Sequence, residues 1–287
     1  MSDASTLAGA VAEALATDVA GLRSLSGGDV ADAYAVDLVD GRTVFAKTHR
    51  RPPPDFFDTE ARGLAWLGAS GAVDVPAVLA HSDAPVPFLV LEWVDEGPRY
   101  LADEADFGRR LAAMHQAGAP AFGRADGRTT GSRGLPNQEC GTWSEFYATQ
   151  RLLPLARLAG DGGALGSTTI DALERLADRL DAWDDGEAPS RLHGDLWAGN
   201  RLVDAAGRSW LIDPACHGGH REFDLAMMRL FGGFGDAVFA AYDEAHPLAA
   251  GWEDRIALHQ VAPLVVHAIK FGGGYVGAAA DAIGRYA

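Results

Sequence analysis

The sequence predicts an α+β fold in two parts, a small antiparallel sheet with one inserted helix followed by a larger and mostly helical part. Strand-like apolar patterns are concentrated in the first third of the chain, and helical spacing dominates after about residue 101. Between these regions lies DEGPRYLADEA, an acidic stretch with proline and glycine that is typical of a crossing between domains. We therefore expect a first domain over residues 1–94 and a second over residues 95–287.

The expected sheet domain opens with a helix over residues 6–20, because Leu7, Val11, Leu15 and Val19 recur every four positions. Two strand patterns follow, ADAYAVDLV and RTVFAKTH, and the Asp-Gly pair between them is a strong hairpin signal. The segment DFFDTEARGLAWL has helical spacing, and PFLVLEWV is a continuous apolar run of the buried-strand type. These patterns predict a sheet with one helix inserted between its strands.

The second domain is expected to consist of amphipathic helices. One of them carries Phe107, Leu111, Met114 and His115 on a single face. Further helices are predicted at residues 168–183, 222–231, 236–245, 253–271 and 276–285, with Pro263 bending the fourth of these. Residues 117–141 show no period and many glycines, so they form either a substrate loop or a surface excursion.

Composition restricts the classes of function. The 287 residues include 24 basic and 40 acidic side chains, and the net charge of −16 disfavours binding to a nucleic-acid backbone. Two cysteines, Cys140 and Cys216, fit a reducing compartment without a disulfide framework. The N-terminal stretch lacks a basic leader, and nowhere do about 18 apolar residues run together. We expect a soluble, cytoplasmic protein with no nucleic-acid or membrane partner.

The stretch RLHGDLWAGNRLVDAAGRSWLIDP, residues 191–214, concentrates the candidate chemistry. Its segments RLV and SWLI are short strand candidates joined by DAAGR, so they should pair as a hairpin. A register that opposes Leu202 to Leu211 would set Asn200 opposite Asp213. An amide oxygen and a carboxylate are hard ligands of the kind that Mg²⁺ takes together with substrate phosphates and water. The sequence therefore predicts a Mg²⁺ site made by Asn200 and Asp213.

Asp195 lies five residues before Asn200, in the turn that leads into this hairpin. A carboxylate there can accept the proton of an incoming hydroxyl and orient it for in-line attack, so Asp195 is the predicted catalytic base. His193 is expected to brace the turn by hydrogen bonding the backbone, and Asp224 to hold the turn in a similar way. The order of turn, aspartate, asparagine, hairpin and second aspartate is that of phosphotransferase catalytic and metal loops.

The first domain offers a phosphate-binding pair. Lys47 lies in the strand pattern VFAKTH, and Glu60 lies on the apolar face of the next helix, where an unpaired carboxylate would be costly to bury. An ion pair between them would remove that cost and position the ammonium for ATP phosphates. Gly27 and Gly28 would cover the phosphates with backbone amides. Backbone groups for adenine are expected after the apolar strand, at Glu92, Trp93 and Val94.

Several motifs resemble those of the fructosamine kinase (ketosamine 3-kinase) family, which belongs with the aminoglycoside and choline phosphotransferases in the protein-kinase-like fold. HGDLWAGN resembles the family signature, and IDPACHGGHREFDLAMMRLFGGF resembles its metal-binding aspartate with the helix that follows. SEFYATQRLLPL is similar to the stretch before the catalytic loop, and SGGDVADAY to the glycine loop. The similarity runs from about Gly27 to Leu248, and Trp197 is its most discriminating residue.

The resemblance implies a bilobal enzyme that transfers phosphate from ATP, with Mg²⁺, to the sugar 3-hydroxyl of a ketosamine such as fructosamine or ribulosamine. Such an activity repairs glycated small molecules or glycated protein side chains. By motif, Asp195 is the base, Asn200 and Asp213 are the Mg²⁺ ligands, and Lys47 with Glu60 is the phosphate-binding pair.

The chain departs from the family pattern after the metal motif, where Cys216 and His217 stand in place of a common aromatic residue, and Ala198 replaces a frequent serine. These departures leave the particular ketosamine open, and His217 is a candidate substrate contact. Trp197, beside the predicted base, either stacks on the sugar or fills the core.

Two alternatives remain at this level. A kinase of the same architecture could act on an aminoglycoside, choline or homoserine, since an acidic protein suits any cationic amine. A nucleotide-binding pseudokinase could serve as a scaffold, although every residue that the chemistry needs is present. Assaying ATP turnover against a range of hydroxyl acceptors separates these alternatives.

Overall fold

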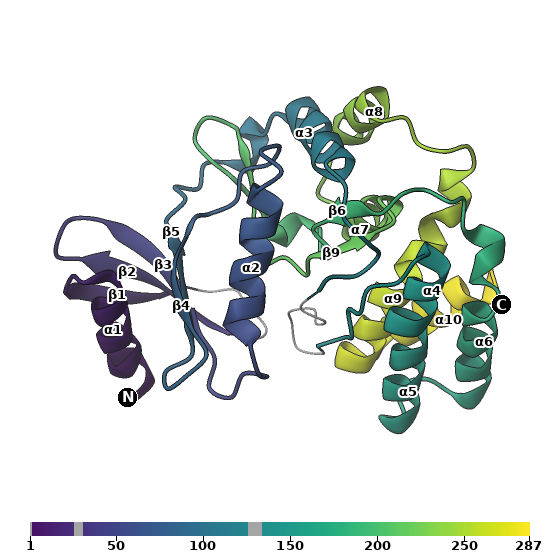
Figure 1. The fold of residues 1–287 in the computed structure, drawn as a ribbon, viewed down its shortest axis with the longest axis horizontal. Helices are drawn as coiled ribbons and strands as arrows, with labels where there is room; N and C mark the ends of the chain where they lie inside the picture. The colour runs from purple at the N-terminus through teal and green to yellow at the C-terminus, as the bar shows by residue number, and fades with distance from the viewer. Residues whose placement is uncertain (1, 26–30, 126–133) are drawn as a thin grey trace. The chain divides into compact units, whose positions relative to one another are not determined.

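The computed structural model describes residues 2–25, 31–125 and 134–287, and within them the chain forms two compact units (Figure 1). Unit 1 contains the described residues up to 103 together with 201–215, and unit 2 contains the others. The antiparallel sheet of unit 1 and the mostly helical unit 2 confirm the predicted α+β class. The division into domains at residue 94 stays a prediction.

Unit 1 is built on a five-stranded antiparallel sheet in the order β1-β2-β3-β5-β4. The predicted Asp-Gly turn joins β2 to β3. Gly41 has a φ of 89°, which strains most other residues, and the N–H of Leu38 donates to the carbonyl of Arg42. The strands are β1 (Val19–Leu25), β2 (Asp32–Leu38), β3 (Thr43–Thr48), β4 (Val78–Ser82) and β5 (Phe88–Glu92).

Helices pack on both faces of this sheet, which explains the continuous apolar run of β5. Helix α1 (Ser2–Leu15) packs on one face, where Val90 joins its cluster. Helix α2 (Phe56–Gly68) packs on the other face, where Leu89 and Leu91 join its cluster. Because alternate side chains of a strand point to opposite faces, a strand covered on both sides is apolar throughout. Figure 1 shows the sheet between the two helices.

The predicted helix over residues 6–20 is wrong in its last part, because α1 ends at Leu15 and Val19 begins β1. Ala16 takes a left-handed φ of 51°, which ends the helix, and the carbonyl of Asp18 then accepts from the N–H of Val39. Val19 is therefore a strand residue that happens to continue the spacing of the helix.

The hairpin of β7 (Arg201–Val203) and β8 (Ser209–Leu211) forms in unit 1, but its predicted register is wrong by one residue. Leu202 pairs with Trp210 and not with Leu211, so the pairing no longer sets Asn200 opposite Asp213. The reason lies in the connection, where the N–H of Asp204 donates to the carbonyl of Arg208 and Gly207 has a φ of 83°. A three-residue loop that ends in a left-handed glycine fixes this register.

Unit 2 packs its helices around a core that includes Phe146, Leu155, Leu176 and Leu258. Its α-helices are α3 (Glu104–Gln116), α4 (Trp143–Tyr147), α5 (Leu153–Asp161), α6 (Ser167–Ala177), α7 (Glu222–Phe231), α8 (Asp236–Ala245), α9 (Trp252–Phe271) and α10 (Gly274–Gly284). The short helical turns are η1 (Arg99–Leu101) in unit 1 and η2 (Ala148–Leu152), η3 (Leu180–Trp183) and η4 (Ala198–Asn200) in unit 2.

Helices α7 and α8 have the predicted bounds, and α9 contains Pro263. The single helix predicted over residues 168–183 is wrong, because α6 ends at Ala177 and η3 is a separate turn. Arg179, with a φ of −114°, interrupts the helical backbone between them, although the apolar spacing continues.

The two-stranded pair of β6 (Ser190–Leu192) and β9 (His217–Gly219) lies in unit 2 and leads into the turn that carries Asp195. Gly218 also pairs with Gly123, which attaches a described part of the 117–141 segment to β9. A Cβ at Gly218 would lie 1.9 Å from the carbonyl oxygen of Ala121, so only glycine permits this close approach.

Both cysteines are free thiols, in agreement with the expectation from their number. Among the described residues, we find no helix whose length and apolar character would let it cross a membrane.

Helix α3 approaches α8 closely at Gly108, where a Cβ would lie 2.2 Å from the carbonyl oxygen of Val238. We predict that Gly108→Ala lowers the free energy of unfolding by about 2–3 kcal/mol, because backbone atoms cannot move aside as a flexible side chain can. Gly160→Ala in α5 is the matched control, since nothing lies within 4 Å of its Cβ. The control should change stability by less than about 1 kcal/mol, in the favourable direction. Equal effects in urea unfolding would contradict the prediction.

Candidate functional site

The turn between β6 and η4 carries Asp195 and is braced by its own side chains. The N–H of Asp195 donates to Nδ1 of His193 at 3.2 Å, which confirms the predicted bracing by this imidazole. Nδ2 of Asn200 donates to the backbone carbonyl of Asp195 at 2.8 Å and to its Oδ2 at 3.1 Å. Gly194, with a φ of 81°, allows the reversal of the chain. The structure thus brings Asp195 and Asn200 together, with the carboxylate oriented by the amide.

Asp224 of α7 anchors this turn from a fully buried position. Its two carboxylate oxygens accept the backbone N–H groups of His193 at 2.8 Å and Gly194 at 2.9 Å. Nε2 of His115 lies 3.3 Å from the same carboxylate, and Nδ1 of His115 lies 2.7 Å from the hydroxyl of Tyr242. Burial alone would raise the pKa of Asp224, but His115 and the N–H of Gly194 lower it overall. The ionised carboxylate therefore holds the turn, as predicted.

Trp197 lies two residues after Asp195 and is 42% exposed, so it does not simply fill the core. Its indole covers Gly199, where a Cβ would lie 2.1 Å from the ring. The indole also meets Phe231 edge to face, with ring centroids 6.4 Å apart. Glycine at position 199 is therefore what allows the tryptophan to fold back and present a ring at the surface.

His217 of β9 is only 3% exposed. Its ring stacks on Phe146 with centroids 5.3 Å apart and meets Phe223 edge to face at 5.9 Å. The predicted contact between His217 and a substrate stays a prediction.

Unit 1 contains the predicted ion pair between Lys47 of β3 and Glu60 of α2, and both residues are buried. The ammonium also lies 2.7 Å from Oδ1 of Asp213, a contact that the sequence did not reveal. Burial alone would lower the pKa of Lys47, but Asp213 and Glu60 raise it, so the amine stays protonated. Burial raises the pKa of Glu60 to about 7, against the opposing effect of Lys47. Two carboxylates thus share one ammonium.

Asp213 is suited to contact a further cation. Its side chain is 47% exposed, and its φ of 52° is uncommon for a residue other than glycine. Its carboxylate oxygens are hard donors of the kind that Mg²⁺ binds. Because Lys47 balances only one of the two carboxylates near it, the donor chemistry and the local charge both fit a hard divalent cation.

The segment predicted to bind adenine follows β5. The N–H of Glu92 donates to the carbonyl of Ala77 at 2.9 Å, and Oε2 of Glu92 accepts the N–H of Ala77 at 2.9 Å. Nε1 of Trp93 donates to Asp95 at 2.9 Å, and Val94 is partly buried. Their contact with a nucleotide stays a prediction. The predicted phosphate loop, at Gly27 and Gly28, falls outside the described residues.

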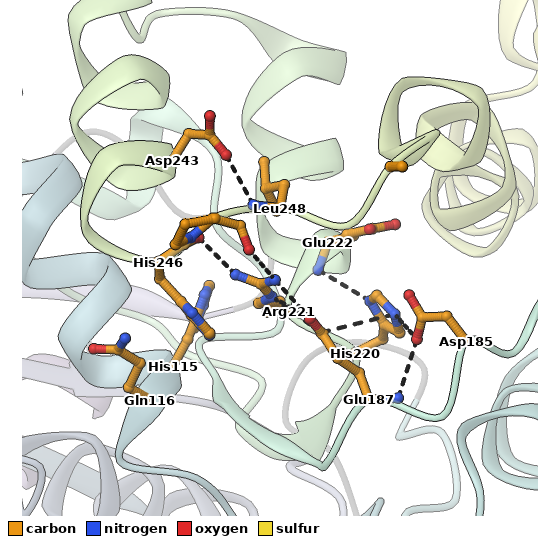
Figure 2. A network of polar contacts seen from close by, with 12 residues as sticks. His115, Gln116, Asp185, Glu187, His220, Arg221, Glu222, Asp243, His246 and Leu248 are labelled. Carbon is orange, nitrogen blue, oxygen red and sulfur yellow. Dashed lines mark hydrogen bonds and ion pairs between the residues drawn. The ribbon is translucent and has the colours of Figure 1, made fainter.

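A network of polar contacts, centred on the buried Arg221, surrounds the start of α7 (Figure 2). Arg221 donates from Nε to the carboxylate of Glu187 at 2.7 and 3.0 Å. Its two terminal nitrogens donate to the backbone carbonyls of His246 at 2.8 Å and Pro247 at 2.7 Å. One side chain therefore joins the loop before β6 to the chain that follows α8. The sequence did not single out Arg221, because its partners are backbone groups and a distant glutamate.

His220, Glu222 and His259 form a buried cluster with ligand-type atoms within 4.8 Å of one another. Arg255 already donates to both carboxylate oxygens of Glu222, at 2.8 and 2.5 Å, and His220 lies 3.2 Å from Asp185. The guanidinium supplies the positive charge that a metal ion would bring, so this cluster is a salt-bridged part of the core. Burial lowers the pKa of His259 to about 4, and its ring is therefore neutral at pH 7.

Comparison with known proteins shows the family to which the chain belongs. The family model for fructosamine kinase matches residues 4–287. A Synechocystis protein assigned as a ketoamine kinase is 35% identical over 259 residues, which cover 88% of this chain and 85% of that protein. The chloroplastic protein-ribulosamine 3-kinase of Arabidopsis thaliana is 32% identical over 286 residues, covering 96% of this chain and 85% of that protein.

Solved structures with a similar fold support the same conclusion. A crystal structure from Thermobifida fusca, assigned as a fructosamine-3-kinase, has a TM-score of 0.90 at 42% identity and covers 98% of both chains. The gentamicin complex of APH(2″)-IIa has a TM-score of 0.66 at 13% identity, covering 97% of this chain and 95% of that one. The second likeness shows the fold alone, and together they confirm the predicted protein-kinase-like architecture.

The neutral, buried His259 predicts how stability depends on pH. An ordinary histidine with a pKa of about 6.5 binds a proton in the unfolded chain before His259 does in the folded one. Stability should therefore fall as the pH drops from about 6.5 to 4, by up to about 3 kcal/mol. His259→Gln should remove this decrease in the free energy of unfolding at low pH. His81→Gln, at an exposed position of β4, should keep it. Urea unfolding between pH 4 and 7 tests this, and identical slopes in both variants would contradict it.

Proposed function

Since the chain belongs to the fructosamine kinase family, we propose that it transfers the terminal phosphoryl group of ATP to the 3-hydroxyl of a ketosamine. Ketosamines form when a reducing sugar glycates an amine, so this reaction is a step in deglycation repair. Fructosamines and ribulosamines are the proposed acceptors, because relatives of the chain carry those names.

The observation that carries this proposal is the braced turn around Asp195, in a chain that matches the family model almost from end to end. The amide of Asn200 orients the carboxylate of Asp195, and Asp224 fixes the backbone of the turn. A general base has to be held within hydrogen-bond reach of one hydroxyl, and these contacts restrict its movement.

In the proposed reaction, Asp195 accepts the proton of the 3-hydroxyl while the hydroxyl oxygen bonds to the γ-phosphorus. The bond from that phosphorus to the β–γ bridging oxygen breaks, and ADP carries away the bonding electrons. Asp195 then returns its proton to solvent. Trp197 offers the partly exposed face of its indole to the sugar.

The nucleotide site is proposed to combine the remaining predicted residues. Lys47, kept charged by Glu60, binds phosphate oxygens. Asn200 and Asp213 are the residues that would hold Mg²⁺, which would neutralise charge on the phosphates. Backbone groups bind the rest of the nucleotide, at Gly27 and Gly28 for the phosphates and at Glu92, Trp93 and Val94 for adenine.

We extend the proposal to glycated protein side chains, because the plant relatives are named protein-ribulosamine 3-kinases.

We also propose that the protein works in a reducing compartment such as the cytoplasm, which its two free thiols, at Cys140 and Cys216, support.

A coupled ADP-release assay across ribulosamines, fructosamines and aminoglycosides tests the proposal. We predict turnover with the ketosamines, and a loss of about 10²–10⁴-fold in kcat for Asp195→Asn, with ATP affinity changed less than about threefold. Asp181→Asn, at an exposed position of η3, is the control and should keep wild-type activity. Turnover of aminoglycosides alone would replace the acceptor class. Near-normal activity of Asp195→Asn would overturn the assignment of the base.

The metal assignment predicts a separate effect at Asp213. Asp213→Ala should weaken the binding of Mg-ATP at least about tenfold, because one hard ligand and the second partner of Lys47 are removed together. Isothermal titration with and without Mg²⁺ measures this, with Asp37→Ala on the exposed side of β2 as the control. The affinity for metal-free ATP should change much less. An unchanged Mg-ATP affinity in a folded variant would exclude Asp213 as a ligand.

A further inference from the structure

Unit 2 carries a continuous row of aromatic rings that begins beside Asp195. Trp197 is followed by Phe231 at a centroid distance of 6.4 Å, and Phe231 by His267 at 4.8 Å. His267 contacts Phe271 at 5.4 Å and Tyr275 at 5.0 Å, and the last two are 6.1 Å apart. Such distances are those of interacting rings, so these side chains form one connected surface. We call Trp197, Phe231, His267, Phe271 and Tyr275 the aromatic row.

The aromatic row is only partly covered by the protein. Trp197 is 42% exposed at one end and Phe271 is 52% exposed at the other, and the three rings between them are partly buried. Among the described residues, Tyr100 of unit 1 is the other large aromatic residue that stays exposed. Single exposed apolar residues are ordinary, but connected ones mark a surface that binds something.

The fold holds the outer part of the row in place. Nδ1 of His267 donates to the carbonyl of Pro263 at 2.8 Å, which orients the imidazole. Gly272 and Gly273 follow α9 with φ values of 62° and 57°. Helix α10 then begins at Gly274 and places Tyr275 against His267. Because these positive φ values favour glycine, the sequence FGGG encodes the turn that brings Tyr275 back to the row.

We propose that the aromatic row binds the amine carrier of the ketosamine, meaning the group joined to the sugar nitrogen, and that it favours carriers with an apolar or aromatic end. This inference rests on the proposed function. The 3-hydroxyl has to reach Asp195, and the sugar nitrogen is three bonds away from the carbon that bears this hydroxyl. The carrier therefore leaves the sugar close to Trp197, where the row begins.

The chemistry of the row fits such a carrier. The nitrogen of a ketosamine is a protonated secondary amine, and the face of an indole attracts a cation. Beyond it, rigid rings offer apolar contact area to an extended carrier at a low cost in conformational entropy. At the far end, Nζ of Lys270 lies 4.9 Å from the ring centroid of Phe271. This ammonium repels a second cation on the carrier, so an apolar end is preferred there.

Two fructosamines with carriers of different reach test the proposal, one made from methylamine and one from 6-phenylhexylamine, whose chain is long enough to bring its ring to the outer part of the row. We expect the wild-type kcat/KM to be about tenfold higher for the phenylhexylamine adduct, and Phe271→Ala and Tyr275→Ala each to reduce this ratio to about twofold or less. Leu158→Ala, at a 38% exposed apolar position of α5, is the control and should keep the wild-type ratio. Phe271 is half exposed, so its replacement should leave unfolding by urea nearly unchanged.

The two adducts separate the role of the aromatic row from the kinase activity itself. A wild-type ratio near one, or a ratio that survives both replacements in the row, would overturn the role of the aromatic row and leave the ketosamine kinase activity intact. Failure to phosphorylate either adduct, together with turnover of another hydroxyl acceptor, would overturn the proposed function and this inference with it. A terminal ammonium on the carrier should lower kcat/KM in the wild type, and a rise would also contradict the proposal.

Discussion

The buried carboxylate of Asp224 is the constraint on which the turn that carries Asp195 depends. It accepts two consecutive backbone N–H groups of the turn, from His193 and Gly194, and Nε2 of His115 lies 3.3 Å from it inside the core. An unpaired carboxylate in this place would be very costly, so the three partners and the turn geometry stabilise one another. The backbone that carries Asp195 is therefore fixed from below, and Asn200 orients its carboxylate from the side. Asp195 stays partly exposed while the residue that supports its turn is buried.

The main electrostatic feature of unit 1 is a buried lysine with two carboxylate partners. The ammonium of Lys47, which we propose to bind phosphate, has to remain charged while buried, and it does so between Glu60 and Asp213. Two carboxylates then lie beside one ammonium, and burial, with a smaller contribution from Asp213, raises the pKa of Glu60 against the effect of Lys47. A bound divalent cation would balance the second carboxylate. The partly exposed Asp213 is the group that can meet it, since Glu60 is almost fully covered.

Local patterns in the sequence predicted the α+β class, the sheet with its inserted helix, and the pairing of Lys47 with Glu60, because a buried carboxylate on an apolar helix face demands a partner. They did not locate the end of α1, since Val19 continues a helical spacing inside a strand. The hairpin register was missed because it depends on the loop that ends at Gly207. The partners of His115 were missed for another reason: they come from helices more than 100 residues away, and only the fold brings them together.

The central claim is that the chain places a phosphate on one particular oxygen of an amine-linked sugar. The most direct measurement is ³¹P and ¹³C NMR of the product formed from ATP, Mg²⁺ and a fructosamine. The account predicts a single phosphate ester on the sugar carbon 3, formed in step with ADP. Release of inorganic phosphate without an ester, or an ester on another carbon, would contradict it.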